Sequence, residues 1–269
     1  MLRVNGHIGK TTLKGRLSDV NAVLEKYLTS KQLHVHELLD VAVSSGITAW
    51  EWLQSLSAAG RKVRITATDL VLEAFLVTIG PCLRVLTDIH GNALQYDVLG
   101  LGIRPGRPRP RDFLGGQWVL SLFMRGLWWR YKKQQLRLSD AAAGEGCFDC
   151  DPRQGIRIRL ISQQIPEAPN PLFVQDDLFA PLPSEFLGRF DVVRAANILN
   201  LAYFPSEKIV AVSRRLKHCC RPGGILLVCR TWEDGSNHGT IFCLGRNDAL
   251  RAVVRFGCGS EVESQVLQA

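Results

Sequence analysis

Apolar residues near the start of the chain follow two spacings, one typical of helices and one typical of buried strands. Residues 13–28 carry apolar side chains at steps of three and four, which predicts an amphipathic helix. The apolar run 36–43 predicts a strand, and a helix opens at Thr48 with the capping-box pattern Thr48-x-x-Glu51. The segment 62–69, KVRITATD, predicts the next strand. This order of strand, helix and strand favours a parallel sheet.

The regular alternation is interrupted in the middle of the chain. Residues 70–77, LVLEAFLV, have a helical pattern, and residues 82–98 predict two strands around a Gly-Asn turn. The segment 104–111, RPGRPRPR, is typical of a stiff polyproline conformation, and a helix is expected over 116–138. We therefore expect residues 81–155 to form an insertion in the main domain.

Strands separated by helical patterns return after the insertion. A helix is predicted over 206–219, and the chain closes with a strand, an Arg-Asn-Asp turn and a strand over 239–257. The other expected strands are IRIRLIS (156–162), PLFVQDDLF (171–179), RFDVVRAAN (189–197) and RPGGILLVCRT (221–231). This pattern predicts a mostly parallel α/β sheet with an antiparallel C-terminal hairpin. We expect an N-terminal helical segment, 1–35, and one large domain, 36–269.

Composition narrows the class of protein and its compartment. The 269 residues are 46% hydrophobic and 22% charged, enough to bury a large core. The sequence contains no run of eighteen uncharged apolar residues, so we expect no membrane span. The N-terminus lacks the apolar core of a secretory signal. Several of the eight cysteines lie in apolar strand-like runs, which favours a reducing compartment. We expect a cytoplasmic protein, with association to a membrane surface left open.

One cysteine pair has the spacing of metal ligands. Cys147 and Cys150 form a single CxxC motif. Without a second pair this motif is a weak zinc signal, so we predict no metal site.

The net charge of +8 is concentrated in one segment. Residues 104–137 hold nine Lys or Arg against one acid, while the rest of the chain carries 24 basic and 24 acidic residues. Within 117–137 the apolar Leu122, Phe123, Leu127, Trp128 and Tyr131 can share one helix face, with Arg130, Lys132, Lys133 and Arg137 toward the other. Such a helix suits a lid over a cofactor site, or an anionic membrane surface or acidic substrate. Nucleic acid is the least favoured partner, since no base-stacking motif supports it.

Small residues occupy alternate positions directly after the predicted strand 36–43. Asp40 is followed by Ala42, Ser44 and Gly46. A loop between a parallel strand and a helix presents backbone N–H groups to a cofactor, and its residues must be small because the ligand approaches the backbone closely. A second requirement is an acid at the end of the next strand, and Asp69 follows Gly46 by 23 residues.

With these features the chain resembles class I S-adenosylmethionine-dependent methyltransferases. LLDVAVSSG resembles their first motif, ATDL their second-strand acid, VQDDLF their adenine-contacting aspartate, and RPGGILLV the turn before their fifth strand. FDVVRAANILNLAYF is similar to the fourth-strand region of chemotaxis-receptor glutamate methyltransferases, with Arg194 three residues before Asn197 instead of adjacent to it. The resemblance implies a Rossmann-like seven-stranded sheet with helices on both faces, and the cofactor S-adenosylmethionine.

The resemblance also implies roles for individual residues. Asp40 would anchor the methionine end of the cofactor, directly or through water. Asp69 would hold the ribose hydroxyls, with Leu70 against the adenine. The remaining cofactor residues would be Ala42, Ser44 and Gly46 along the methionine arm, Asp177 or less readily Asp176 at the adenine amino group, and Asn197 and Ile198 near the sulfonium.

The reaction itself needs little from the protein beyond positioning, because the methyl group is already activated. Asn197 and Tyr203 are candidate catalytic residues by position alone. The acceptor is an unidentified small molecule, lipid or protein. Two other functions stay open: a catalytically inactive binding protein of the same fold, and a nicotinamide-dependent oxidoreductase. The latter lacks its GxGxxG motif here.

Overall fold

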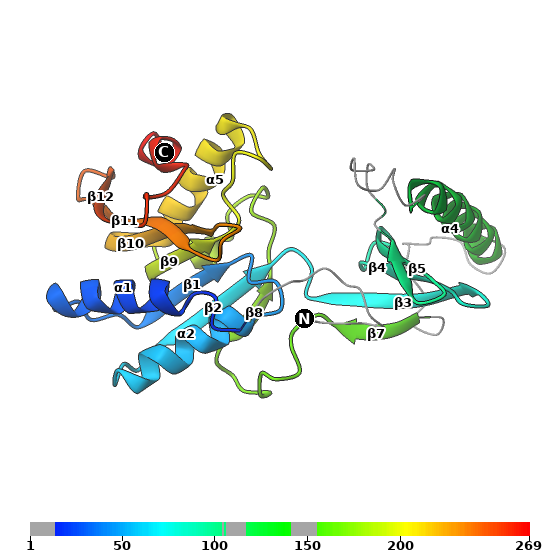
Figure 1. The fold of residues 1–269 in the computed structure, drawn as a ribbon, viewed down its shortest axis with the longest axis horizontal. Coiled ribbons are helices and arrows are strands. Elements are labelled where there is room, and N and C mark those ends of the chain that lie inside the picture. Colours follow the sequence, from blue (N-terminus) through cyan, green and yellow to red (C-terminus); the bar gives the residue numbers. More distant parts are fainter. Residues whose placement is uncertain (1–13, 104, 106–116, 141–154) are drawn as a thin grey trace. The chain divides into compact units, whose positions relative to one another are not determined.

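The protein is described by a computed structural model over residues 14–103, 105, 117–140 and 155–269. The chain forms two compact units (Figure 1). The smaller is built from the described part of Glu73–Leu160. The larger comprises the described residues up to Leu72 together with Ile161–Ala269. Each unit has its own sheet, and each is considered by itself.

A seven-stranded sheet is the framework of the larger unit. Its strand order is β12-β11-β10-β9-β1-β2-β8, in which β8, β2, β1, β9 and β10 run parallel and β11 and β12 add an antiparallel meander. The strands are β1 (Glu37–Val41), β2 (Arg64–Asp69), β8 (Leu172–Gln175), β9 (Phe190–Ala196), β10 (Cys220–Thr231), β11 (Asn237–Leu244) and β12 (Leu250–Phe256). The predicted fold class, a mostly parallel seven-stranded sheet with an antiparallel C-terminal hairpin, is confirmed.

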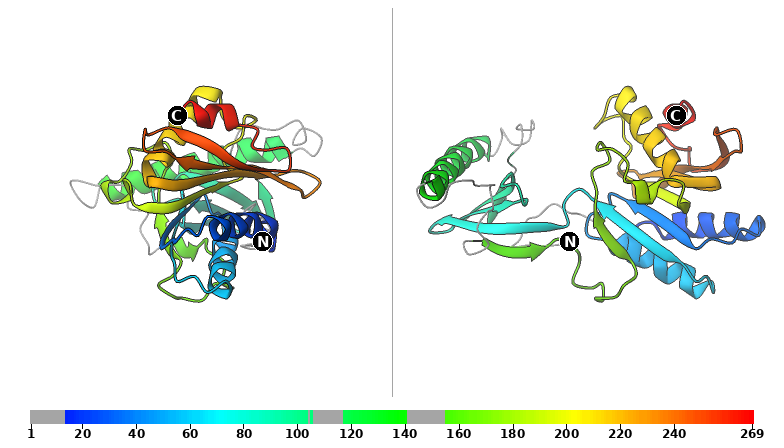
Figure 2. Two further views of the ribbon diagram at one scale, coloured as in Figure 1. Left: turned by 90° about the vertical axis from the view of Figure 1, so that its left-hand side faces the viewer. Right: turned by 180° about the vertical axis from the view of Figure 1, so that it is seen from behind.

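Helices cover both faces of this sheet (Figures 1 and 2). Alternate residues of each strand point to opposite faces: Val192 packs with α1 and α2, and the next residue, Val193, packs with α5. The helices are α1 (Ser18–Ser30) and α2 (Ile47–Ala58) on one face, and α5 (Ser206–Cys219) and α6 (Glu263–Leu267) on the other, with a short 3-10 helix η1 (Ser184–Phe186) before β9.

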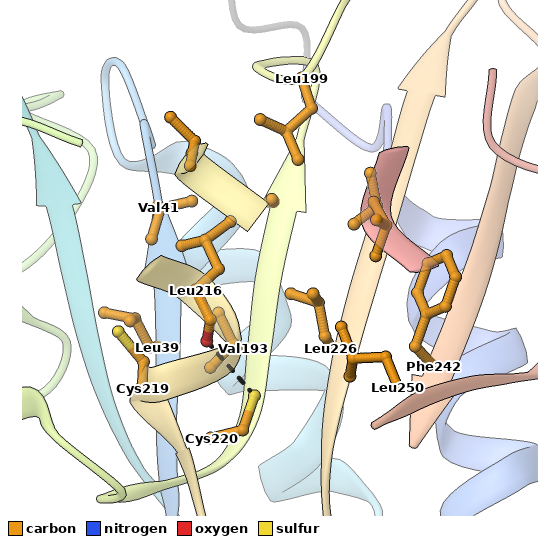
Figure 3. Packing of buried hydrophobic residues seen from close by; sticks show 14 of the residues in the cluster. Leu39, Val41, Val193, Leu199, Leu216, Cys219, Cys220, Leu226, Phe242 and Leu250 are labelled. Carbon is orange, nitrogen blue, oxygen red and sulfur yellow. Dashed lines mark hydrogen bonds between the residues drawn. The ribbon is translucent and has the colours of Figure 1, made fainter. Parts of the chain in front are cut away.

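The α5 face is a continuous apolar layer (Figure 3). Leu216 of α5 belongs to this layer together with Val193 of β9 and Leu226 of β10, and all three side chains are fully buried. The thiol of Cys220 donates to the Leu216 carbonyl at 3.5 Å. Burial raises the pKa of the neighbouring Cys219 to about 12. These two cysteines therefore act as small apolar residues of the core.

The smaller unit is an antiparallel sheet with one long helix. The order β6-β5-β4-β3-β7 joins β3 (Glu73–Gly80), β4 (Leu83–Thr87), β5 (Ala93–Val98), β6 (Leu101–Ile103) and β7 (Gly155–Arg159). Helix α4 (Gln117–Asp140) packs on the sheet through Met124 and Trp128, which contact the layer of Val85 and Tyr96. The hairpin β4–β5 and the helix 116–138 are thus confirmed as predicted elements.

Two predictions about this unit are wrong. Residues 70–77 do not form a helix, since β3 starts at Glu73 and pairs with both β4 and β7. A short apolar run fits either period, and here pairing on two sides decides in favour of a strand. The segment 156–162 does not extend the parallel sheet, because β7 pairs antiparallel with β3. The described part of this unit belongs to Glu73–Leu160.

The orientation of α4 also differs from expectation. Leu127, Trp128 and Tyr131 pack on the sheet as one group, but Leu122 and Phe123 are each 57% exposed on the opposite side. The helix is more evenly apolar around its circumference than the predicted two-faced pattern, so the sheet selects which side is buried. Among the described helices, none is both long and apolar enough to cross a membrane.

Some sequence features lie outside the described residues. They are Cys147, Cys150 and the segment 104–111 apart from Pro105. Within the described ranges, no cluster of three His, Cys, Asp or Glu side chains is suited to a metal ion.

Candidate functional site

The middle of the parallel sheet contains a topological switch point. Strands β1 and β9 are neighbours, but the chain leaving β1 enters α2 on one face and the chain leaving β9 leads to α5 on the other. In open α/β sheets, ligands bind outside the carboxyl ends of the strands at such a point. The predicted cofactor residues all belong to the carboxyl ends of β1, β2, β8 and β9 or to the segments that directly follow them.

The loop after β1 has the backbone of a glycine loop. Ala42, Ser44 and Gly46 have φ values of 56°, 58° and 77°, so three alternate residues are left-handed. A left-handed conformation costs a residue with a side chain about 1–2 kcal/mol. Alanine and serine therefore hold a conformation that glycine would adopt without strain. Such strain persists only where the surrounding structure enforces it, and it clusters at ligand sites.

Gly46 is required at its position for a second reason. A Cβ atom built on Gly46 would lie 2.6 Å from Cε1 of Phe173 and 3.1 Å from Cδ1 of Ile165. Phe173 belongs to β8, so the aromatic ring of one strand closes against the backbone that starts α2. Gly46 is the N-cap of α2, which corrects the predicted capping box: Thr48 lies inside the first turn, and Glu51 accepts from the Gly15 N–H instead.

Asp69 links the end of β2 to this loop. Its Oδ2 atom accepts a hydrogen bond from the Ser44 N–H at 2.6 Å, and Oδ1 accepts from the Val71 N–H at 3.3 Å. The Asp69 carboxylate is partly exposed, and the adjacent Leu70 side chain is 57% exposed. The structure thus brings together two groups that the sequence predicted separately, the small-residue loop and the second-strand acid.

Asp40 has a very different environment. Its Oδ1 accepts from Arg194 Nε at 2.9 Å and its Oδ2 from Nη2 at 2.6 Å, with both side chains almost completely buried. The same guanidinium donates to Asn21 and to the Thr48 carbonyl, and it lies 4.1 Å from the ring centre of Trp52. Asp40 and Arg194 are direct register partners on β1 and β9. Both oxygens of the predicted methionine anchor are therefore engaged within the protein.

The two aspartates after β8 are also distinguished by their surroundings. Asp176 forms a bidentate ion pair with Arg215 of α5 at 2.7 and 3.1 Å, and both side chains are nearly buried. Asp177 is exposed and accepts from the Phe179 N–H at 2.9 Å. Asp176 thus fastens α5 to the strand end, while Asp177 faces solvent.

Asn197, the first residue after β9, is left-handed with φ 61°. Its side-chain oxygen accepts from the Thr231 N–H at 2.7 Å, and its amide nitrogen donates to the Thr231 hydroxyl at 3.2 Å. Ile198 packs against the α5-side core. Tyr203, the second candidate catalytic residue, is 65% exposed. Asn197 therefore holds the β9 loop to β10, and Tyr203 lies farther out on that loop.

Sequence reasoning missed the partner of Asp40. Arg194 lies in the buried run FDVVRAA, where an arginine requires a buried counter-charge. Asp40 in the buried run HELLDVAV required the same. Since each of these buried charges needs a partner of opposite sign, an ion pair between Asp40 and Arg194 could have been predicted. The contact of Phe173 with Gly46 had no comparable signal, because β8 and α2 meet only in the folded chain.

Comparisons with known proteins add no family assignment. No protein-family description matches the chain, and no curated protein matches it. Among solved structures, one that is similar is the CMeT domain of the citrinin polyketide synthase, with a TM-score of 0.38 and 13% identity over 81% of this chain and 35% of that one. The chain thus spans about a third of that structure's length.

Two other solved structures have comparable scores. The PH0226 protein of Pyrococcus horikoshii has a TM-score of 0.37 and 12% identity, covering 93% of this chain and 78% of that one. Magnesium protoporphyrin IX methyltransferase of Synechocystis, solved with bound SAH, has a TM-score of 0.32 and 11% identity, covering 80% and 55%. Several of the similar structures are named as methyltransferases, but at these scores the likeness carries no argument about activity.

Proposed function

We propose that this chain is an S-adenosylmethionine-dependent methyltransferase. One observation carries the proposal: the loop at the switch point keeps left-handed backbone at three alternate positions, two of them without glycine, and Ser44 donates from this loop to Asp69. Strained backbone of this kind clusters at ligand sites, and here it lies at the carboxyl ends of the strands where a ligand is expected. The sequence motifs quoted above supply the identity of the cofactor.

The residues at the strand ends fit an adenosyl group. Asp69 and Asp177 are the partly exposed and exposed carboxylates after β2 and β8, and carboxylates accept hydrogen bonds from hydroxyl and amino groups. Leu70 offers an exposed apolar side chain between them in sequence. We assign the ribose to Asp69, the adenine face to Leu70 and the adenine amino group to Asp177.

The loop and the start of α2 suit the methionine part. Ala42 and Ser44 are small and partly exposed, and the first turn of α2 has N–H groups that favour a carboxylate. The Ser45 hydroxyl is buried and has no hydrogen-bond partner among the described residues, which is typical of a group that a water or ligand completes. Asp40 acts indirectly on the start of α2, because it binds Arg194, whose guanidinium also donates to the Thr48 carbonyl.

The bound cofactor would supply an activated methyl group, so the protein's task is orientation. Asn197 and Ile198 start the segment after β9 and are proposed to border the reacting end. The Asn197 amide is committed to Thr231, so we assign it a positioning role, with Tyr203 as the candidate that faces an acceptor. The acceptor is a small molecule, a lipid or a protein.

A binding protein of the same fold without activity is the second candidate. It is favoured by the replacement of two glycines and by the engagement of Asp40 with Arg194. A nicotinamide-dependent oxidoreductase would also use an acid in the place of Asp69, but the loop lacks GxGxxG.

Calorimetric titration of the full chain with S-adenosylmethionine and S-adenosylhomocysteine tests the proposal. We expect micromolar binding that falls about 100-fold in Asp69→Ala, because the variant removes a charged hydrogen-bond acceptor. Asp88→Ala is the matched control. Asp88 also accepts backbone N–H bonds in a loop, but it belongs to the smaller unit, so cofactor affinity should be unchanged.

The outcomes separate the candidates. Binding with methyl transfer to any acceptor supports the enzyme, and binding without transfer across acceptor classes supports the inactive binding protein. A folded chain that binds neither compound overturns the cofactor assignment, and binding of NADH instead would favour the oxidoreductase.

A further inference from the structure

The outer face of α4 carries apolar and basic side chains together, with no acidic residue among them. From Gln117 to Ser139 the sequence has no Asp or Glu. Its exposed apolar and basic side chains are Trp118, Val119, Leu122, Phe123, Arg125, Trp129, Arg130 and Lys133. We call these eight residues the α4 outer face.

The opposite side of α4 is fully used in packing. Met124 and Trp128 are buried against the five-stranded sheet. The indole N–H of Trp128 and the ammonium of Lys132 both donate to the Gly91 carbonyl at 3.3 Å. These bonds fix the rotation of the helix about its axis. The exposure of the α4 outer face is therefore set by packing on the other side.

Several large apolar side chains of the α4 outer face are more than half exposed to solvent. Leu122 and Phe123 are each 57% exposed and Trp129 is 61% exposed, on one helix of a unit whose sheet already has its own core. Single exposed apolar residues are common, but clustered ones mark an interaction surface. Because 3.6 residues make one turn, positions 122, 129 and 133 lie along one line on the helix surface.

The charges select the partner. Arg125, Arg130 and Lys133 lie among the apolar residues, and the Lys133 ammonium lies 4.9 Å from the ring centre of Trp129. An ammonium over an aromatic ring stays near the depth of that ring instead of pointing away from it. Aromatic and leucine side chains that sink to the acyl boundary, with Lys and Arg at headgroup level, are the features of interfacial helices.

We propose that the α4 outer face binds an anionic lipid surface, with α4 lying in the plane of the interface. A nucleic acid would contact the cations but leave Leu122 and Phe123 exposed to water, so a lipid surface accounts for more of the face. The inference does not rest on the proposed methyltransferase function, since its residues belong to the other unit.

Co-sedimentation of the full chain with vesicles tests this proposal. The vesicles are phosphatidylcholine alone, or phosphatidylcholine with about one third phosphatidylglycerol. We expect preferential binding to the anionic vesicles that weakens as the ionic strength is raised to about 1 M. Circular dichroism of each variant checks that the fold is kept.

Two variants address the two components of the face. Phe123→Ser with Trp129→Ser should lower vesicle affinity at least about tenfold, because it removes most of the apolar insertion. Arg130→Gln with Lys133→Gln should lower it about fivefold per cation on anionic vesicles only. Leu99→Ser with Leu101→Ser is the matched control. These leucines are 76% and 59% exposed in the same unit but lie outside α4, so affinity should be unchanged.

Several results would overturn the proposal. They are equal binding to neutral and anionic vesicles, binding that survives both α4 variants, and no binding by the folded chain. Tighter binding to a short RNA or DNA than to vesicles would assign the face to nucleic acid. Self-association that is abolished by the Phe123 and Trp129 variant would assign it to a second copy. S-adenosylmethionine titration of the same variants is independent, so failure here leaves the cofactor proposal standing.

Discussion

Asp40 and Asp69 lie on neighbouring parallel strands of one sheet, yet their carboxylates have different surroundings. Asp40 lies within β1, where Arg194 engages both oxygens in a region closed to water. Asp69 ends β2, where it accepts from the loop N–H of Ser44 and remains partly exposed. The position of each acid in its strand therefore determines its role. Asp40, within the strand, is engaged in the fold, and Asp69, at the strand end, can contact a ligand.

The largest effect is expected from breaking the interior pair. Arg194→Met should lower the free energy of unfolding by about 3–5 kcal/mol, because Asp40 would be left buried without a counter-charge. Urea denaturation followed by circular dichroism measures this. Arg189→Met is the control, since Arg189 pairs with Glu37 at a partly exposed site and its loss should cost less than about 1 kcal/mol.

The double variant Asp40→Leu with Arg194→Met tests whether the unpaired buried charge causes this loss of stability. Because both charges are removed together, we expect it to be more stable than Arg194→Met alone. If Arg194→Met were no less stable than Arg189→Met, the interior pair would not be the structural element inferred here.

In the loop after β1, a larger side chain should weaken cofactor binding without destabilising the fold. Ala42→Leu is expected to lower S-adenosylmethionine affinity about 10- to 100-fold, because the side chain would occupy the space through which the ligand reaches the backbone. The unfolding midpoint should change little, since Ala42 is partly exposed. Ala58→Leu, at an exposed position at the end of α2, is the control. Unchanged affinity in Ala42→Leu would remove the loop from the site.

Placing glycine in the loop should have a smaller effect, and it should stabilise the fold, in contrast to Arg194→Met. Ala42→Gly and Ser44→Gly should each raise the free energy of unfolding by about 1 kcal/mol, because glycine adopts left-handed φ without strain. Thermal denaturation measures the gain. Ala211→Gly, at an exposed position within α5, should instead lose about 1 kcal/mol. A loss of stability in both loop variants would mean that the loop is not left-handed.

The last effect is absent at neutral pH and concerns the buried thiols of the interior. Burial raises the pKa of Cys229 and of Cys219 to about 12. In the unfolded chain these thiols ionise near pH ~8.5, so the stability they contribute is complete below that pH and is lost as pH rises toward 12. Denaturation midpoints should therefore fall above pH ~9.

Two comparisons check that these thiols are responsible. In Cys219→Ala with Cys229→Ala the decline above pH ~9 should be shallower than in the natural chain. In the folded chain, alkylating reagents should modify the exposed Cys82 and Cys258 before the buried pair. An equally steep decline in the variant would exclude the thiols as the cause.

The local sequence was sufficient to predict those elements whose residue pattern fits only one type of secondary structure. Helix α5 and the hairpin β11–β12 lie where the sequence predicts them, because apolar spacing and turn residues agree there. For 70–77 the same kind of pattern was ambiguous, and pairing on both sides made β3 a strand. The predicted cap at Thr48 failed similarly, since Phe173 from a distant strand packs against Gly46 and helps to define the start of α2.

The candidate site shows the same division. By itself the sequence determined the parallel α/β class and placed small residues and acids at the strand ends, because side-chain size and strand order can be read locally. Only the tertiary structure decided which acids are available: Arg194 engages Asp40, Arg215 engages Asp176, and Asp69 and Asp177 remain at the surface. Ion pairing depends on residues more than 150 positions apart for Asp40 and 39 apart for Asp176. Those separations are bridged by strand register and helix packing, which no local pattern encodes.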